Sequence, residues 1–583
     1  MIHCLNRLTN ALQPDIQPLT RAQVSVVADA RIDGRAALVD HLRARGEDVS
    51  LDSGDAALIL ASYLTWGERC IEYLIGDFSF IVWDDRAKKL FAARDHIGKR
   101  SLYYAQTRDA LIISNELRPL RLLPDLNLDL DPVYIADFLA LGEGFWLDRT
   151  ATPFAAIRRL DRGHLLIFEG GALSIRPYWI PPVETPPLRY RREEETLEHF
   201  RSAFREAVRD RLRADRVVLT LSGGMDSSTV TAIAVDLIRN GEASAQFTAI
   251  TTSYSRPDFQ DPEEAYSRSI AERLGFAEHH VIRRVESPRL LLPYVHIANA
   301  IRPMLMPDMS RHYLERLASL GQVTFFGHLG DSLGGNLPLA RALPHMQLAR
   351  FSRAYFTLWR AFGKRPNLGS GALSRLLRRG QARRAEAYPF PTWMNPDFVR
   401  QFAIRERWEQ YWSGLANLEE GRDKVRNPYL LRTVADYDHY SYDEFAGVDF
   451  VPSDAVDPYG DVRVLDLLFR LDPLPWFHKK YLQRQLMRGL LPSEVLNRPK
   501  QVFGDLTGYL LGLPESAWID RWIPSGPLQA FVERSRIPTI TGKHARMMAG
   551  QLIHLRPLML DLWLRGEQDI LRQQLTDTHD EAL

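Results

Sequence analysis

Short apolar runs that end in turn residues dominate the first third of the chain. Residues 24–32 (VSVVADARI) and 78–83 (FSFIVW) are rich in β-branched and aromatic side chains, which predicts strands. The apolar positions of Asp55–Trp66 recur at helical spacing, and Asp55 stands where an N-cap belongs. Further strand-like runs lie at 101–104, 111–114 and 164–168. The front third is therefore predicted to be an α+β domain.

The pattern of apolar positions changes near residue 217. Strand-like runs at 217–221, 246–252 and 322–326 alternate with helical spacing at 227–239 and 262–274. Such alternation predicts an α/β domain with a doubly wound parallel sheet. Beyond about residue 340, the spacing of apolar positions is mainly helical up to the C-terminus.

A proline-rich stretch separates the two regions. Ile180–Pro187 (IPPVETPP) contains four prolines, which predicts a stiff, extended linker. A chain of 583 residues is also too long for one hydrophobic core. We therefore expect a front domain at 1–180, a linker at 181–193 and a large domain at 194–583.

The bulk composition narrows the classes of protein. Lys and Arg number 74 against 73 Asp and Glu, so the net charge of +1 gives no general reason to expect nucleic acid or an acidic membrane as a partner. Two cysteines cannot form a disulfide framework, and no apolar run is long enough for a transmembrane helix. We expect a cytoplasmic protein. Residues 353–384 carry nine basic and no acidic side chains, which fits a solvated loop or a partner surface equally well.

The most informative stretch is the run SGGMDSS at 222–228, between a predicted strand and a predicted helix. Its glycines let backbone N–H groups face an anion, and the helix N-terminus adds a partial positive charge. Asp226 beside a phosphate implies a divalent cation. No lysine follows the glycines, which favours pyrophosphate release over γ-phosphate transfer. A simple Ser/Asp-capped turn is the alternative, and the complete strand–loop–helix pattern disfavours it. The predicted ATP and pyrophosphate contacts here are Ser222, Gly223, Gly224, Asp226, Ser227 and Ser228.

This loop resembles the pyrophosphate loop of the ATP-pyrophosphatase superfamily, and a second motif narrows the resemblance to asparagine-synthetase-like enzymes. Residues 325–336 (FFGHLGDSLGGN) are similar to the family motif G-E-G-A-D-E. The resemblance implies that Asp226 and Asp331 hold Mg²⁺ and that Gly330 contacts the nucleotide. His328 stands where asparagine synthetases carry Glu and beta-lactam synthetases Tyr. Lasso-peptide cyclases share the Gly-His-x-Gly-Asp form, so they are the nearer resemblance.

A third block, at 458–468, 479–484 and 491–500, resembles the C-terminal signature of the same family. By resemblance, Lys480 contacts pyrophosphate. Lys500 stabilises the charge that develops on the acyl-adenylate and on the tetrahedral intermediate, a large contribution in many catalysts. Either lysine taken alone would be read as a solvated surface charge.

Glu444 is a further candidate. It lies where beta-lactam synthetases hold the Glu that pairs with their catalytic Tyr, so the resemblance implies a His328–Glu444 pair. Histidine suits a general base because its ordinary pKa is near neutral and a carboxylate can orient the ring. A solvated Glu444 is the alternative.

The front region resembles a glutamine amidotransferase domain that has lost its chemistry. Residues 76–80 (GDFSF), 94–98 (RDHIG) and 102–104 (LYY) carry this resemblance. The position of the nucleophilic Cys holds Ile2, and Arg31 stands where an acidic group should hold the ammonium of glutamine. We expect no glutamine hydrolysis. The matched region also begins late, so either strands are missing or the true start lies upstream.

The preferred hypothesis is a lasso-peptide macrolactam synthetase that uses ATP and Mg²⁺. It would adenylate an Asp or Glu side chain of a core peptide for attack by the N-terminal amine of that peptide, with effectively unimolecular kinetics. A leader peptidase and a leader-recognition protein are the expected protein partners. The alternatives are a glutamine-dependent asparagine synthetase, a beta-lactam-type amide synthetase and a non-catalytic ATP-binding scaffold.

Overall fold

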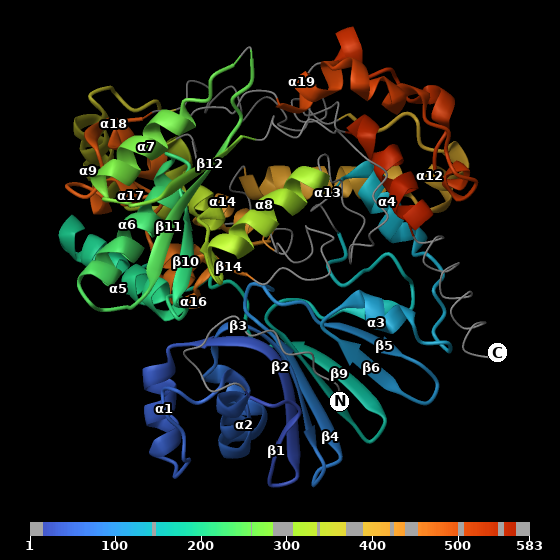
Figure 1. The fold of residues 1–583 in the computed structure, drawn as a ribbon, viewed down its shortest axis with the longest axis horizontal. Helices are drawn as coiled ribbons and strands as arrows, with labels where there is room; N and C mark the ends of the chain where they lie inside the picture. Colours follow the sequence, from blue (N-terminus) through green and yellow to red (C-terminus); the bar gives the residue numbers. More distant parts are fainter. Residues whose placement is uncertain are drawn as a thin grey trace.

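The computed structural model describes most of the chain and contains three β-sheets (Figure 1). The described residues are 15–142, 147–257, 259–283, 307–334, 339–368, 389–419, 425–435, 437, 453–498, 506–545 and 553–566. The front part lies at the bottom of Figure 1, and the large domain with the C-terminal helices lies above it.

The front sheet is antiparallel and has six strands in the order β1-β2-β3-β4-β8-β9. They are β1 (Leu19–Arg21), β2 (Val24–Asp33), β3 (Ile75–Asp84), β4 (Lys89–Arg94), β8 (His164–Glu169) and β9 (Ala172–Pro177). Three helices accompany it: α1 (Arg35–Arg43), α2 (Asp55–Trp66) and the 3₁₀ helix η1 (Gly67–Glu72). Alternate β2 residues Val24 and Val26 are fully buried in a core shared with α1 and α2, as expected of a sheet with one covered face.

A small second sheet joins the front region to the C-terminal region. It has the order β6-β5-β7, with β5 (Tyr103–Gln106), β6 (Leu111–Ser114) and β7 (Ile157–Arg159). Helix α3 (Leu117–Arg121) packs against β6, and helix α4 (Pro132–Ala140) follows it in the chain. Phe138 and Trp393 belong to one buried core. Arg407 donates to Asp137 at 2.8 Å, and Arg556 donates to Leu139 O at 3.0 Å. Figure 1 accordingly draws α4 among the C-terminal helices.

The large domain is built on a five-stranded parallel sheet in the order β12-β11-β10-β13-β14. Its strands are β10 (Arg216–Thr220), β11 (Gln246–Ser253), β12 (His279–Arg283), β13 (Val323–Phe325) and β14 (Asp454–Val456). β10 lies in the centre, and its Val217, Val218 and Leu219 are fully buried. Because both faces of the sheet are covered at β10, the sequence of this strand is a continuous apolar run.

Helices surround this sheet and form the rest of the large region. The α-helices are α5 (Glu193–Arg211), α6 (Met225–Arg239), α7 (Glu263–Arg273), α8 (Pro307–Leu320), α9 (Leu348–Phe362), α12 (Pro396–Gln401), α13 (Ile404–Glu419), α14 (Pro428–Ala435), α16 (Val462–Arg470), α17 (Tyr481–Leu486), α18 (Ser493–Leu496) and α19 (Leu506–Gly512). The 3₁₀ helices are η3 (His328–Gly334), η4 (Leu339–His345), η6 (Pro458–Gly460), η7 (His478–Lys480), η8 (Pro514–Arg521), η9 (Pro527–Ala530), η10 (Arg534–Arg536), η11 (Gly542–His544) and η12 (Ile553–Leu555). The predicted α+β front and parallel α/β domain are confirmed.

Two details differ from the sequence-based expectation. Asp55 is not the N-cap of α2: it is the first helical residue, and its side chain accepts from Ile32 N at 2.9 Å. Asp15 caps the helix from outside, accepting from Ala56 N at 2.8 Å and Ala57 N at 3.2 Å. The predicted helical character after residue 340 also has an exception in β14, a three-residue strand that exists through its pairing with β13.

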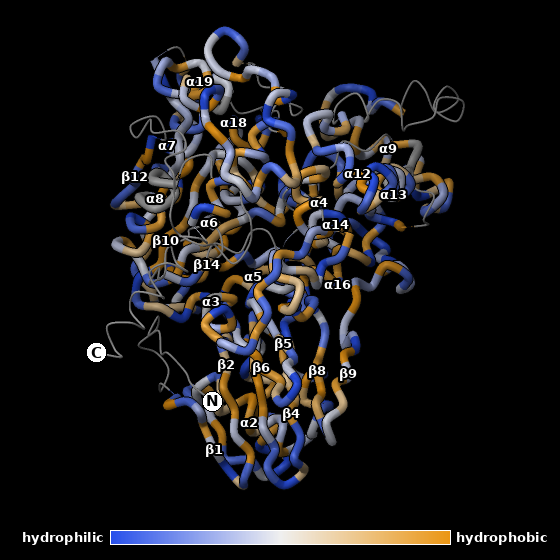
Figure 2. The backbone as a smooth tube through the Cα atoms, turned by 90° about the vertical axis from the view of Figure 1, so that its right-hand side faces the viewer, coloured by the Kyte–Doolittle hydropathy of each residue, from blue (hydrophilic) through white to orange (hydrophobic). Residues whose placement is uncertain are grey.

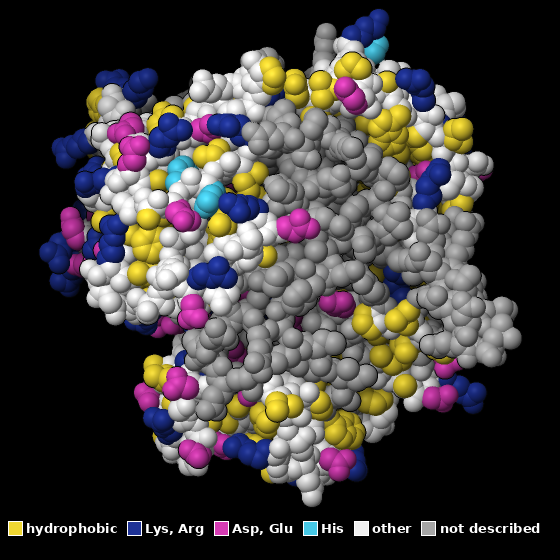
Figure 3. Space-filling view, in the orientation of Figure 1, with side chains coloured by type: hydrophobic (Ala, Val, Ile, Leu, Met, Phe, Trp, Pro, Cys, Tyr) yellow, Lys and Arg dark blue, Asp and Glu magenta, His cyan; other side chains and the backbone are white. Residues whose placement is uncertain are grey.

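Hydropathy and charge follow these layers. Figure 2 shows apolar stretches along the sheet strands and hydrophilic ones at the strand turns. Over the described part of the face in Figure 3, basic and acidic side chains are interspersed, in keeping with the net charge of +1. Among the described residues, no helix is both long enough and apolar enough to cross a membrane. Of the basic run at 353–384, the first part lies on α9, and 369–384 lie outside the described residues.

Candidate active site

The loop between β10 and α6 needs glycine at its sharpest point. Gly223 has φ +67°, a left-handed conformation. A Cβ at this position would lie 2.6 Å from Tyr266 Cβ, so a side chain would clash with α7 as well as strain the backbone. The loop therefore passes close to the neighbouring helix, at the carboxyl end of the central strand, where open α/β sheets bind ligands.

Hydrogen bonds of the serine side chains fix the conformation of this loop. Ser227 Oγ accepts from Ser222 N at 3.0 Å and pairs with Ser222 Oγ at 2.9 Å. Ser228 is buried and donates to Gly224 O at 2.6 Å, so in this state its hydroxyl is engaged by its own helix. No side chain caps the N-terminus of α6. Its first-turn N–H groups and its helix dipole can therefore serve an anion such as a phosphate.

Three predicted site residues from separate elements meet beside this loop. The Lys480 ammonium donates to Asp226 Oδ2 and to Asp331 Oδ1, the latter at 3.0 Å. Gln483 Nε2 donates to Asp226 Oδ1 at 2.7 Å. Burial raises the pKa of Asp226, Lys480 partly offsets the rise, and Asp331 adds to it. The pKa of Lys480 is raised because its two carboxylates outweigh the desolvation that lowers it.

Two glycines of the second motif allow the loops to approach. A Cβ on Gly327 would lie 2.9 Å from the carbonyl carbon of Asp226, and one on Gly330 would lie 2.7 Å from Asp226 Cβ. The sequence suggested Gly330 as a nucleotide contact. Its observed neighbour is Asp226, so the missing side chain brings the loop of Asp331 against the phosphate loop.

The pair of carboxylates fits Mg²⁺. Both carboxylates already contact one positive charge, the ammonium of Lys480. Asp226 and Asp331 are therefore close enough to share a cation. Mg²⁺ commonly binds one or two carboxylates together with substrate phosphates and water. Among the described residues, no cluster of three or more His, Cys, Asp or Glu side chains forms a complete metal site. With ATP bound, phosphate oxygens would complete the coordination of a metal held by Asp226 and Asp331.

His328 lies on η3 in a buried setting that differs from the expected one. Its ring stacks on Phe326 with 5.1 Å between centroids and 15° between planes. Burial lowers its pKa to about 4, with Lys99 of the front region adding to the decrease. In this state the pKa of His328 lies below the ordinary near-neutral value, so the ring is neutral at pH 7, and its role as a base stays a prediction. Glu444 and Lys500 lie outside the described residues, and their roles stay predictions.

Several residues that sequence reasoning passed over support the site. Gln483 also donates to Tyr459 OH at 2.9 Å, and Asp457 accepts from Leu329 N at 2.9 Å. Burial raises the pKa of Asp457 to about 7. Gln483 and Tyr459 both stood inside the quoted third block, and Gln483 is only three residues from Lys480, so membership of that block was the available signal. Asp457 lies just outside that block and gave no such signal.

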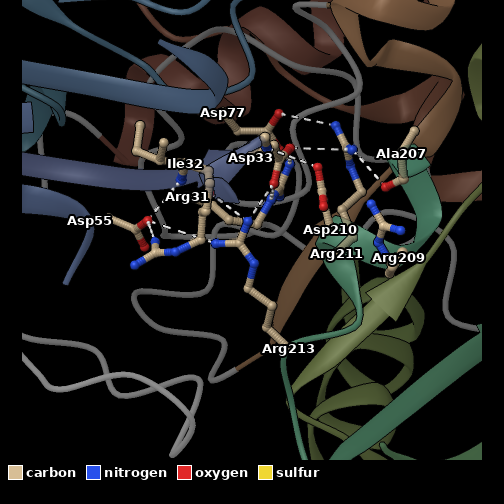
Figure 4. Close-up of polar contacts among 12 residues, drawn as sticks. Arg31, Ile32, Asp33, Asp55, Asp77, Ala207, Arg209, Asp210, Arg211 and Arg213 are labelled. Atoms are coloured by element: carbon tan, nitrogen blue, oxygen red, sulfur yellow. Dashed lines mark hydrogen bonds and ion pairs between the residues drawn. The ribbon is translucent and has the colours of Figure 1, made fainter. Parts of the chain in front are cut away.

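The front region holds Arg31 in a closed cluster of charges (Figure 4). Its guanidinium donates to both oxygens of Asp33 at 3.1 Å and lies 2.8 Å from Asp77 Oδ2. Asp33 also pairs with Arg211 at 3.3 Å and with Arg213 at 3.1 Å, both from the large domain. Asp33 and Asp77 thus already hold guanidinium groups, and the expected loss of glutamine hydrolysis stays a prediction.

A parallel sheet with an anion-binding loop at the end of its central strand, and two carboxylates beside that loop, defines a nucleotide-binding α/β protein. A family model described as asparagine synthase matches residues 199–565, and one described as a glutamine amidotransferase domain matches residues 7–179. The chain belongs to the asparagine synthase family.

Individual relatives match a shorter stretch. An asparagine synthetase [glutamine-hydrolyzing] 3 of Bacillus subtilis is 34% identical over 198 residues, covering 33% of this chain and 31% of the relative. Two fungal proteins are each 31% identical over 242 residues, or 39% of this chain: amidase chry2 of Gibberella zeae (35% of its length) and amidase chyE of Penicillium rubens (34%). The matched stretches span about a third of each relative.

Proposed function

We propose that this protein is an ATP-dependent, AMP-forming carbon–nitrogen ligase. It activates a carboxylate as an adenylate, releases pyrophosphate and passes the acyl group to an amine. The anion-binding loop at Ser222–Ser228, the Asp226–Asp331 pair and Lys480 supply groups suited to magnesium pyrophosphate, and family membership supports the same chemistry. ATP would supply the leaving group, while the residues of this chain bind and orient the phosphates.

Within that class we propose a lasso-peptide macrolactam synthetase. The observation that carries this choice is the closed Arg31 cluster, because Asp33 and Asp77 hold a guanidinium of the protein rather than a substrate ammonium. This cluster argues for an amine that arrives on the substrate rather than as ammonia from glutamine. An N-terminal amine tethered to the activated Asp or Glu meets that requirement, since tethering makes the attack unimolecular. A leader peptidase and a leader-recognition protein would prepare and deliver such a peptide.

A glutamine-dependent asparagine synthetase is the second candidate. The similarity to the B. subtilis asparagine synthetase, and the match of residues 7–179 to a glutamine amidotransferase domain, favour it. The two candidates share the adenylating half and differ in the source of the amine.

One assay separates them. The protein is incubated with ATP, Mg²⁺ and a synthetic core peptide that has a free N-terminal amine and an internal Asp or Glu. AMP and pyrophosphate formed together with a peptide lighter by one water support the macrolactam synthetase, and Lys500→Ala should abolish this product. Ammonia from glutamine and asparagine from aspartate, with the peptide unchanged, would establish the second candidate instead.

A further inference from the structure

One arginine joins the two turns that border the candidate phosphate site. Arg484, on α17, donates from Nε to Lys479 O at 2.8 Å, from Nη1 to Leu496 O, and from Nη2 to Arg498 O at 2.8 Å. All three of these bonds end on backbone carbonyls. The planar fork of arginine can satisfy three carbonyls in fixed directions, which a lysine cannot do.

The first of these turns has an unusual backbone. Lys479 and Lys480 both adopt the left-handed conformation, with φ/ψ of 50°/39° and 58°/36°. Two consecutive non-glycine residues in this region cost about 1–2 kcal/mol each, so surrounding contacts must hold them. The second of the two lysines is the one whose ammonium bridges Asp226 and Asp331.

The second turn reaches the same loop at Gly223. Arg498 donates to Glu263 at 2.6 Å, and its guanidinium lies 4.3 Å from the centre of the Tyr266 ring. A Cβ on Gly223 would lie 3.0 Å from Arg498 Nη1, so this arginine packs against the left-handed glycine of the loop. Arg484 therefore joins the turn that carries the Lys480 ammonium to the turn whose Arg498 packs against Gly223 of the loop.

We propose that Arg484 is a positioning residue that keeps the strained Lys479–Lys480 turn in place, so that the Lys480 ammonium stays aligned with the phosphate loop. Arg484 touches neither substrate nor metal in this role, and it acts through the backbone carbonyl of Lys479. The proposal rests on the proposed function in one respect, namely that the loop at Ser222–Ser228 binds phosphates.

The test measures binding of inorganic pyrophosphate with Mg²⁺ by calorimetry, which needs no acceptor substrate. We expect Arg484→Lys and Arg484→Met to weaken binding roughly tenfold, the equivalent of about 1.4 kcal/mol, while the unfolding midpoint changes little. Arg488→Ala, an exposed arginine one turn further along the chain, is the matched control and should bind as the wild type does.

A rescue variant separates positioning from a general loss of structure. Glycine adopts the left-handed conformation without steric cost, so Lys479→Gly in the Arg484→Met background should recover most of the lost affinity. Unchanged binding in both Arg484 variants, or weakened binding that Lys479→Gly does not recover, would overturn the inference and leave the proposed function intact. Failure of the wild-type protein to bind magnesium pyrophosphate would overturn both.

Discussion

Each half of the molecule contains a group of paired charged side chains. The two groups are built from similar residue types, but they differ in how far their carboxylates are exposed to solvent. The front cluster pairs Arg31 with Asp33 and Asp77, and the side chains of these carboxylates are 0% and 7% exposed. The second cluster places one ammonium, that of Lys480, between two carboxylates, of which Asp331 is 54% exposed. The first group is sealed within protein, whereas the second opens to solvent and hence to ligands.

The pKa values express the same contrast. Burial raises the pKa of Asp77, but the attraction of Arg31 and Arg211 outweighs burial, and the net pKa is lowered. At Asp226 burial prevails over the single lysine, and the net pKa is raised. The guanidinium groups of the arginines more than offset the burial of Asp77 in the front cluster. At Asp226 the single ammonium of Lys480 does not offset burial. A buried carboxylate that its own protein leaves undercompensated is suited to a metal ion, and a compensated one is suited to holding structure.

The largest effect should come from Asp226→Asn. We expect AMP formation to fall by about 10³-fold or more, because the substitution removes the carboxylate that would share a metal with Asp331. Stability should hold or rise, since a group whose pKa is raised by folding destabilises the native state above its unfolded pKa. Single-turnover AMP formation and urea unfolding at pH 7.5 measure the two quantities. A variant that loses stability in step with activity would contradict this assignment.

Arg31→Met should act in the opposite way, on stability rather than on phosphate binding. It leaves Asp33 and Asp77 buried with less compensation, which typically costs about 3–5 kcal/mol for a broken buried pair. Urea unfolding gives the loss. The control is Arg86→Met, which removes a half-exposed partner of Asp84 and should cost much less stability than Arg31→Met. Equal losses in the two variants would mean that the Arg31 cluster is not the structural element described above.

A decrease in pH should have a smaller effect on the free energy of unfolding. His96 is buried beside the front cluster, and burial lowers its pKa to about 4, against an ordinary value of about 6.5. As the pH falls from 6.5 towards 4, the unfolded chain takes the proton first, so stability is lost over this window, by at most about 3 kcal/mol. The difference between wild type and His96→Phe, measured by urea unfolding at pH 7 and pH 5, isolates this contribution. An identical pH slope in both proteins would exclude it.

Local sequence pattern was sufficient for elements stabilised by their own composition. The helix at Asp55–Trp66 and the strand at 111–114 have the expected bounds, and the loop at Ser222–Ser228 follows a strand and opens a helix as expected. The meeting of Asp226, Asp331 and Lys480 also agrees with the motif-based expectation, although their roles stay predictions.

Features that depend on distant partners could not be predicted. β14 has only three residues, and its register with β13 rather than its composition makes it a strand. Asp55 is a poor N-cap here because it accepts from Ile32 and Arg35. The neutral, stacked His328 follows from burial, which no periodicity reveals. The carbonyl contacts of Arg484 likewise arise from two turns that meet only in the folded chain.

The position of β14 has a consequence for the order of events during synthesis. The fifth sheet strand begins at Asp454, and the same residue pairs with Arg100 of the front region at 2.9 Å and lies 3.7 Å from Arg31. A nascent chain must therefore grow past this strand before the sheet edge is complete and before Asp454 can contact the front region. Until that point Arg31 and Arg100 lack their contacts with Asp454, and such late-forming, long-range contacts favour misassembly and chaperone engagement.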